Sequence, residues 1–170
     1  MKRHIRHWIQ DYSPKDGGSV TDPAITIGKA AELTGLSEST LRKYEAAGLI
    51  LYARTSGGYR MLSQEDLFRI RIIQSLIKEK GLNLEGIRRL WALLPCWEFR
   101  ECDESERAVC PVFGGVNEPC WVLFKARGGC DGLECRTCEV YRMAASCTED
   151  LKKLVLDLLV AERRKKKPGE

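Results

Sequence analysis

Apolar residues after position 25 recur at the three- and four-residue spacing of a helix. The first series consists of Ile27, Ala30, Ala31 and Leu33. It stops before Gly35, and Ser37 is placed to cap a second helix over residues 38–47 because its hydroxyl can accept a free amide proton of the first turn. Gly48 then supplies the left-handed residue that ends this helix. Two short helices joined by a glycine-containing turn predict a helix-turn-helix.

Short apolar strands follow, on either side of a glycine pair. Residues 49–52 form one strand, residues 61–62 form the other, and Gly57-Gly58 lies between them. This pattern predicts a β-hairpin, which would form a wing beside the second helix. Arg54 and Arg60 flank its tip.

Two longer helical series complete this region. The run Ser63-Gln64-Glu65-Asp66 has a capping-box-like pattern and opens a helix that is expected to end at Gly81. Asn83 can cap the next helix, which Pro95 stops. The apolar stripes of both helices are typical of a packed core.

A last helical series occupies the C-terminal part of the chain. Residues 134–167 contain neither glycine nor proline. Apolar positions there alternate at four- and three-residue spacing: Val140, Ala144, Cys147, Leu151, Leu154, Leu158 and Ala161. This pattern predicts a coiled-coil seam that pairs two chains. The alternative is an amphipathic helix folded onto its own domain.

The predicted fold is therefore mainly α, with a small β wing. We expect a flexible polar arm over residues 1–24, a winged helix-turn-helix head over 25–95, a cysteine-rich metal or cluster module over 96–134, and a long dimerisation helix over 135–167 that shares Cys135 and Cys138 with the module. The head carries 11 basic and 7 acidic residues, whereas residues 96–147 carry 6 basic and 9 acidic ones. A basic head fits a polyanionic partner.

No apolar run approaches the roughly 20 residues that a membrane span needs. The first residues also lack the apolar core of a secretory signal. We therefore expect a cytoplasmic protein without membrane partners, in which thiols stay reduced.

All eight cysteines lie between positions 96 and 147. Clustered thiols in such a setting usually hold a metal or a cluster. The predicted ligands are Cys96, Cys102, Cys110, Cys120, Cys130, Cys135 and Cys138. Cys147 falls in the predicted seam and is assigned to packing. Because thiolates are soft ligands, we favour an iron–sulfur cluster, with zinc as the alternative and a reversible disulfide switch after it.

The head resembles the MerR-type transcriptional regulators. The run from Ser39 to Leu49, STLRKYEAAGL, is similar to the family's T-L-R-x-Y-E-x-x-G-L signature, and Gly57-Gly58-Tyr59-Arg60 resembles its wing. Residues 81–87 most resemble the heat-shock-repressor branch. Farther on, Pro95-Cys96-Trp97 and Pro119-Cys120-Trp121 resemble the cysteine modules with two Cys-Trp pairs that some bacterial signalling proteins carry.

The resemblance implies a homodimer that binds double-stranded DNA at a two-fold-symmetric operator and twists or kinks the promoter, with RNA polymerase as a further partner there. The predicted DNA contacts are Ser39, Thr40, Arg42, Lys43, Tyr44, Arg54, Tyr59 and Arg60. Hydroxyls and cations on such a helix can donate to phosphates and base edges.

Three hypotheses follow. The first is a transcription regulator whose DNA binding responds to a thiolate-bound metal or iron–sulfur centre. The second keeps the DNA binding but makes zinc purely structural. The third is a dithiol redox enzyme at Cys135-x-x-Cys138, but the sequence has no nucleophile–base set and no phosphate loop beside it. We therefore predict that the chain is not an enzyme.

Overall fold

The computed structural model describes residues 19–147 except 101, 125–129 and 131–133. The helices are α2 (Ile27–Thr34), α3 (Glu38–Ala46), α4 (Gln64–Lys78), α5 (Leu84–Ala92), α6 (Cys96–Phe99), α7 (Glu104–Val109), α8 (Cys120–Phe124) and α9 (Glu139–Cys147), with a 3₁₀ turn η2 at Cys135–Thr137. The strands are β1 (Ile25–Thr26), β2 (Ala53–Arg54) and β3 (Arg60–Leu62). The prediction of a mainly helical fold with a small sheet is confirmed. The predicted arm, except for 19–24, and the predicted seam beyond Cys147 lie outside the described residues.

Side-chain caps fix where the long helices begin. Ser37 accepts a hydrogen bond from the Thr40 amide at the start of α3, and Asn83 accepts one from the Gly86 amide at the start of α5. Ser63 and Asp66 form a complete capping box at the start of α4, with each side chain bonded to the other residue's backbone amide. These starts agree with the sequence predictions.

The small sheet differs from the predicted hairpin. Its strand order is β1-β3-β2, and both neighbours run antiparallel to β3, with Ile25 opposite Leu62 and Arg54 opposite Arg60. Residues 49–52 are not a strand: all four are buried and connect α3 to β2. Residues 25–26, which the pattern assigned to the start of a helical segment, pair with the wing instead. We call residues 48–51 the connector.

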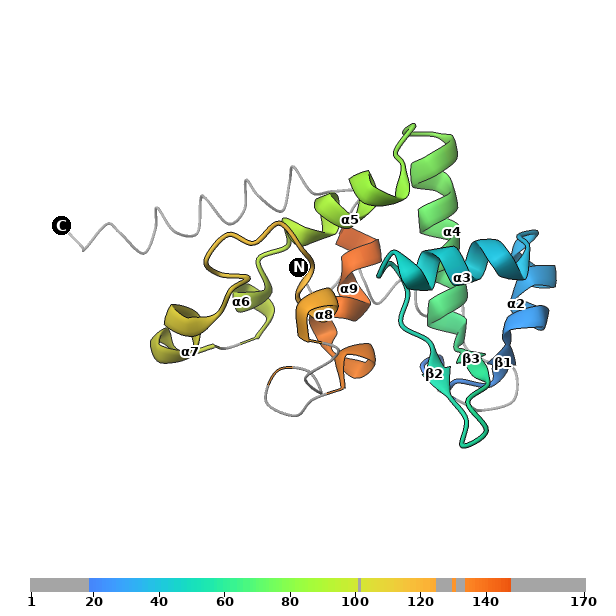
Figure 1. The fold of residues 1–170 in the computed structure, drawn as a ribbon, viewed down its shortest axis with the longest axis horizontal. Coiled ribbons are helices and arrows are strands. Elements are labelled where there is room, and N and C mark those ends of the chain that lie inside the picture. The colour runs from blue at the N-terminus through green and yellow to red at the C-terminus, as the bar shows by residue number, and fades with distance from the viewer. Residues whose placement is uncertain (1–18, 101, 125–129, 131–133, 148–170) are drawn as a thin grey trace.

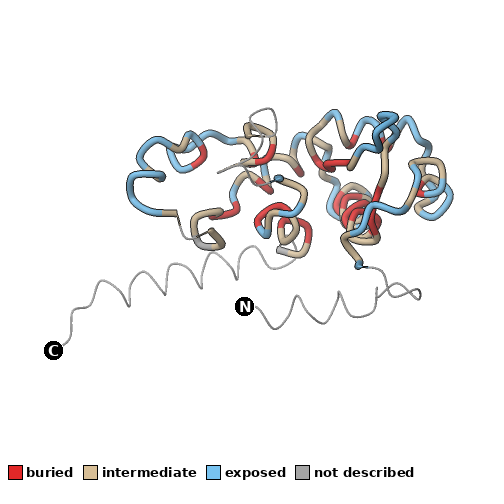
Figure 2. Tube along the Cα trace, turned by 90° about the horizontal axis from the view of Figure 1, so that it is seen from below, coloured by how far each residue is buried: buried red, intermediate tan, exposed pale blue. Residues whose placement is uncertain are grey.

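Head and cysteine region share one hydrophobic core. Figure 1 shows how α8 and α9 lie beside the head helices, and Figure 2 marks the buried stretches of the chain in red. The core joins head residues such as Ile70, Ile73 and Trp91 to Trp121, Tyr141 and other residues of α8 and α9. Helix α7 contributes no buried residue to this core. The described cysteine region is therefore packed against the head rather than set apart from it.

The C-terminal helix begins later than predicted. The chain forms the 3₁₀ turn at Cys135–Thr137, takes an extended conformation at Cys138 and starts α9 at Glu139. Val140 and Ala144, two predicted seam residues, are 2% and 0% exposed within the shared core, where α9 packs on α4. This part of the seam is therefore used inside the chain, as in the alternative of a helix folded onto its own domain. No helix among the described residues is both long and apolar enough to cross a bilayer.

Candidate DNA-binding surface and cysteine cavity

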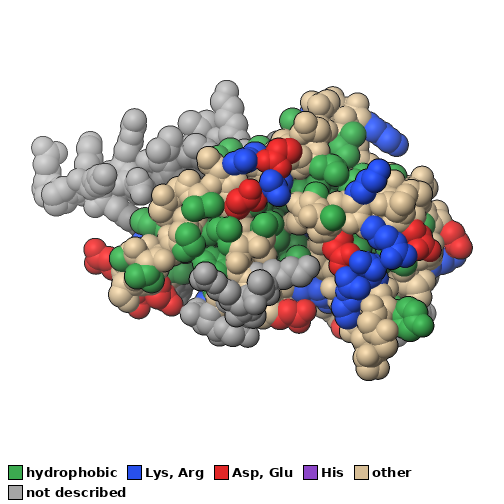
Figure 3. Space-filling view, in the orientation of Figure 1, with side chains coloured by type: hydrophobic (Ala, Val, Ile, Leu, Met, Phe, Trp, Pro, Cys, Tyr) green, Lys and Arg blue, Asp and Glu red, His purple; other side chains and the backbone are tan. Residues whose placement is uncertain are grey.

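Helix α3 and the wing expose the predicted DNA contacts on one side of the head. Ser39, Arg42, Lys43, Arg54 and Tyr59 are exposed, and Thr40 and Arg60 are half-buried. Lys and Arg side chains gather over this part of the surface in Figure 3. Seven of the eight residues are thus at least partly exposed, and their contact with DNA stays a prediction.

Tyr44 is the exception. Its side chain is only 4% exposed and lies in the hydrophobic core, and burial raises the pKa of its hydroxyl. The tyrosine therefore supports α3 from below and does not face a DNA groove. The sequence motif correctly assigned Tyr44 to the second helix. Which side of α3 faces the core depends on packing against the rest of the head.

Glu45 ties the wing to α3. Its Oε1 accepts a hydrogen bond from Arg54 Nη2 and its Oε2 accepts one from Arg60 Nε, both at 2.7 Å. Its carboxylate is 11% exposed, so both ion pairs are partly shielded from water. Lys43, on the same helix, is exposed and makes no ion pair with another described residue. Helix and wing therefore form one basic surface, in which Glu45 pairs with Arg54 and Arg60 and leaves Lys43 exposed.

The seven predicted cysteine ligands line one small cavity. Cys96, Cys102, Cys110, Cys120, Cys130, Cys135 and Cys138 surround about 50 Å³, together with Arg100, Trp121, Phe124, Val140 and Tyr141. All seven are free, half-buried thiols. Positions up to 42 residues apart in the sequence are thus brought to one place by α6, α8 and η2.

Two of these thiols share a hydrogen bond. A bond from the Cys120 thiol lowers the pKa of Cys96 to about 7, and the same bond raises the pKa of Cys120. Burial raises the pKa of Cys130 to about 11 and also raises that of Cys102. The Cys96 sulfur is therefore the one of these four that most readily becomes a thiolate.

The chemistry of this donor set fits a soft metal or an iron–sulfur cluster, because both are held by thiolates. The arrangement does not yet form a coordination shell. Among the described residues, no three His, Cys, Asp or Glu side chains stand together in a way that could hold a metal ion.

The connector is attached to the cysteine region by direct hydrogen bonds. Trp121 Nε1 donates to the Gly48 carbonyl at 2.8 Å, and the Tyr141 hydroxyl accepts from the Leu51 amide at 2.8 Å. Trp121 and Tyr141 also line the cysteine cavity. The wall of the cavity and the segment that joins α3 to the wing are therefore in contact.

Arg69 of α4 lies at the centre of this contact. Its Nε donates to the Leu49 carbonyl at 2.7 Å, and its Nη1 donates to the Tyr141 carbonyl at 2.6 Å. The guanidinium stacks 3.9 Å from the Tyr141 ring and 4.3 Å from the Trp91 ring. Burial lowers its pKa, while Tyr141 and the carboxylates of α4 act in the opposite direction.

Sequence reasoning missed Arg69, Tyr141 and Glu45 as members of the site. One feature of the sequence indicates that Arg69 lies near the core: its neighbours Ile70 and Ile73 belong to the apolar series of the helix. A charge at such a position is usually assigned to the solvated face of a helix. Only the fold brings its guanidinium to two backbone carbonyls.

The match to a family model concerns the head. Residues 25–93 match the family described as MerR HTH family regulatory protein. A protein described as heat shock protein HspR, from Streptomyces coelicolor, is 41% identical over 68 residues, which are 40% of this chain and 45% of the relative. The HTH-type transcriptional regulator ZntR of Escherichia coli K12 is 32% identical over 84 residues, which are 49% of this chain and 59% of the relative. The chain thus spans about half the length of these relatives.

A solved structure is also similar, described as HiNmlR, a MerR family regulator lacking the sensor domain, bound to promoter DNA. It is 26% identical, and the alignment covers 82% of this chain and 87% of that one, with a TM-score of 0.36. A TM-score of this size does not extend the similarity to the arrangement of the elements in space. The matched family and HTH-type relative are named as regulators and not as enzymes, which agrees with the prediction that this chain is not an enzyme. Residues 25–93 are thus similar to the MerR HTH family regulatory proteins.

Proposed function

We propose that the chain is a DNA-binding transcription regulator whose grip on DNA is set by the cysteine cavity. The DNA-binding residues are Ser39, Thr40, Arg42, Lys43, Arg54, Tyr59 and Arg60 on α3 and the wing. The observation that carries the DNA-binding part is the double ion pair of Glu45, which makes helix and wing one surface. A groove-reading helix needs its backbone contacts held in register in this way.

The same proposal includes a homodimer that binds a two-fold-symmetric operator in the cytoplasm, with RNA polymerase as the partner at the promoter. Two-fold symmetry in a protein is matched by symmetry in its DNA site. The support is the similarity of the head to the MerR HTH family regulatory proteins. Because Val140 and Ala144 are buried within the chain, a dimer interface must use other residues.

The cysteine cavity would hold an iron–sulfur cluster, with zinc as the second candidate, through thiolates drawn from its seven cysteines. The cluster would supply electron exchange, and zinc would supply a fixed tetrahedral joint. The Cys96 and Cys120 thiols are already joined by a hydrogen bond in a cavity walled by Trp121 and Tyr141. A displacement of these two rings would move the Gly48 carbonyl and the Leu51 amide through their hydrogen bonds. It would therefore change the angle between α3 and the wing.

The DNA-binding part is tested on a duplex that the full-length protein itself selects from random sequences. Lys43→Ala removes an unpaired cation from α3, so we expect weaker binding and a salt dependence whose logarithmic slope falls by about 0.9, the value for one lost phosphate contact. Lys78→Ala, on the exposed end of α4, is the matched control and leaves both unchanged. Failure to select any duplex at low salt contradicts the proposal.

The regulatory part is tested by purification without oxygen, followed by metal analysis and an absorption spectrum. Visible absorption with bound iron and sulfide supports a cluster, and tightly held zinc without colour supports the alternative. DNA affinity is then compared before and after removal of the centre. Equal affinities contradict a regulatory role but leave the DNA-binding part intact.

A further inference from the structure

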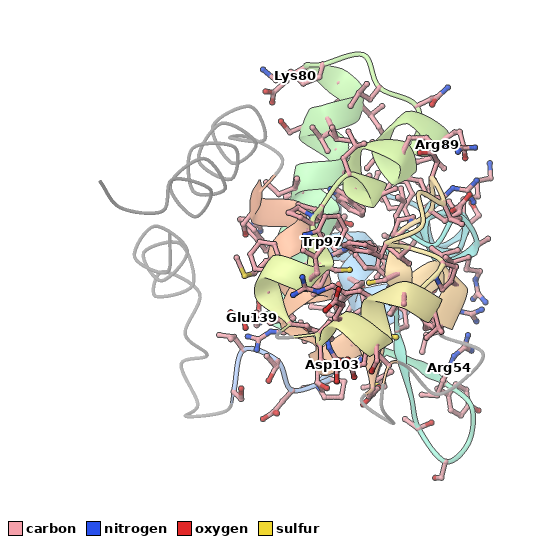
Figure 4. The ribbon with its side chains drawn as sticks, turned by 90° about the vertical axis from the view of Figure 1, so that its left-hand side faces the viewer. Arg54, Lys80, Arg89, Trp97, Asp103 and Glu139 are labelled. Carbon is pink, nitrogen blue, oxygen red and sulfur yellow. The ribbon has the colours of Figure 1, made fainter. Side chains whose placement is uncertain are left out.

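A second and larger cavity lies on the outer side of the cysteines. It has a volume of about 370 Å³, within the range of small-molecule sites. Helices α6 and α7 form two of its sides and face the viewer in Figure 4, where Trp97 and Asp103 are labelled. Cys96, Cys102, Cys110 and Cys130 line both this cavity and the smaller one.

The walls of this outer cavity are aromatic and apolar. Trp97 and Phe113 pack edge to face, with their ring centroids 5.0 Å apart and their planes at 80°. Phe124, Val109 and Pro111 also line it. Such a lining is suited to a flat ring, because aromatic faces and edges attract one another at these distances.

The charges of the cavity favour an anion. Arg100 and Arg107 line it, with Glu106 as the acidic residue among the lining side chains. The Glu106 carboxylate is already engaged, since it accepts a hydrogen bond of 2.8 Å from the Asp103 amide at the start of α7. Arg100 Nη1 reaches the Cys130 carbonyl at 3.4 Å. Arg107 Nε is buried and has no hydrogen-bond acceptor among the described residues, and a buried donor without a partner is costly.

We propose that this outer cavity binds a small aromatic carboxylate. The ring lies among Trp97, Phe113 and Phe124, and the carboxylate accepts hydrogen bonds from Arg107, whose guanidinium is suited to two-point contact with a planar carboxylate. The ligand then lies against the outer thiols of the cysteine cavity. This inference goes beyond the proposed function, because it adds an organic effector to a region for which that function needs only thiolates.

The test uses the full chain and benzoate as the probe, with binding measured by calorimetry and by quenching of tryptophan fluorescence. We expect benzoate to bind at least tenfold more tightly than benzyl alcohol, which has the same ring but no charge. Benzylamine, with the opposite charge, should not bind measurably.

Two variants locate the site. Arg107→Gln should weaken benzoate binding at least tenfold, because the partner of the carboxylate is lost, and Phe113→Ala should weaken it through loss of the apolar wall. Lys78→Gln on α4 is the matched control, since Lys78 is exposed and lines neither cavity. Circular dichroism checks that each variant is folded.

Equal affinity for benzoate and benzyl alcohol would overturn the inference, and so would an Arg107→Gln variant that binds benzoate like the parent chain. Absence of benzoate binding at millimolar concentration would overturn it as well. None of these results affects the DNA-binding proposal, which is measured without the probe.

Discussion

The head and the cysteine region of this chain are stabilised in different ways. In the head, α2 to α5 have 8 to 15 residues, and each begins at a side-chain cap. In the cysteine region, α6, α7 and α8 have only 4 to 6 residues, and α7 buries none of them. Isolated helices this short are not stable in water. The cysteine region therefore depends on a few long-range contacts with the head.

Those contacts are concentrated at the connector and at the start of α4. Trp121, Tyr141 and Arg69 hold the connector, while Arg136 reaches Asp66 at 3.6 Å and Arg142 reaches Glu65 at 3.0 Å. The cysteine region is therefore stabilised by contacts with the same part of the head that positions α3 and the wing. Variants at the junction should therefore affect both regions, and variants at helix caps only one.

The largest effect is expected for Arg69→Met. The change leaves the buried carbonyls of Leu49 and Tyr141 without donors, which should lower the free energy of unfolding by about 4 kcal/mol, roughly 2 for each carbonyl. Chemical denaturation measures this loss. Lys78→Met, at an exposed position on the same helix, is the control and should stay within about 0.5 kcal/mol of the parent chain. Similar losses in both variants would contradict the central position of Arg69.

The next largest loss in the free energy of unfolding is expected for Gly48→Ala. Gly48 has a φ of 71°, and an added Cβ would lie 2.6 Å from Val122 Cγ2 of α8. We expect a loss of about 3 kcal/mol, about 1 from the left-handed backbone and about 2 from overpacking.

Gly35→Ala separates these two causes. Gly35 has a φ of 69°, but nothing lies within 4 Å of the added Cβ, so only the backbone loss of about 1 kcal/mol should remain. The pair Gly48→Ala with Val122→Ala should be less destabilised than the sum of the single variants, because the second change removes the clash. If the losses in the free energy of unfolding were strictly additive, Val122 of α8 would not be the cause of the overpacking at Gly48.

Trp121→Phe should cost about 2 kcal/mol, because it removes the hydrogen bond to Gly48 and leaves a gap beside Trp91 and Tyr141. Hydrogen exchange should become faster in both the connector and the cysteine region. Trp97→Phe is the control, since Trp97 packs on Phe113 outside the shared core. If exchange changed only in the cysteine region, the two regions would not be coupled through Trp121.

The smallest effects are expected at two capping boxes, one in each region. Ser63→Ala removes the buried cap of α4 and should cost about 1 to 2 kcal/mol. Asp103→Ala removes the exposed cap of α7, which buries no residue, and should change the global free energy of unfolding by less than about 0.5 kcal/mol. Equal costs, measured by urea denaturation, would mean that α7 folds as part of the same cooperative unit as α4.

The elements that sequence reasoning placed correctly depend on interactions between residues near in the chain. The caps at Ser37, Ser63 and Asn83 each act within three residues, and Gly48 ends α3 through its own backbone freedom. The seven thiols that line the cavity were also named, because clustered cysteines indicate a shared site even when their order in space is unknown.

What the sequence could not place depends on contacts between distant residues. Strand β1 exists because Ile25 and Thr26 pair with β3, some 36 residues away in the sequence. Tyr44 faces inward because the core of the head lies on that side of α3, and α9 packs on α4 with Val140 and Ala144 in the shared core. A periodic pattern gives the apolar side of a helix but not the partner that covers it.

The sequence by itself determined the helices of the head, their caps, the basic α3 and wing, and the gathering of cysteines in one segment, because each follows from local backbone preference or composition. Only the tertiary structure decided that the cavity of the cysteines touches the connector. That contact needs a buried guanidinium, two aromatic rings and three carbonyls from segments up to 93 residues apart, and long-range packing alone brings such groups together.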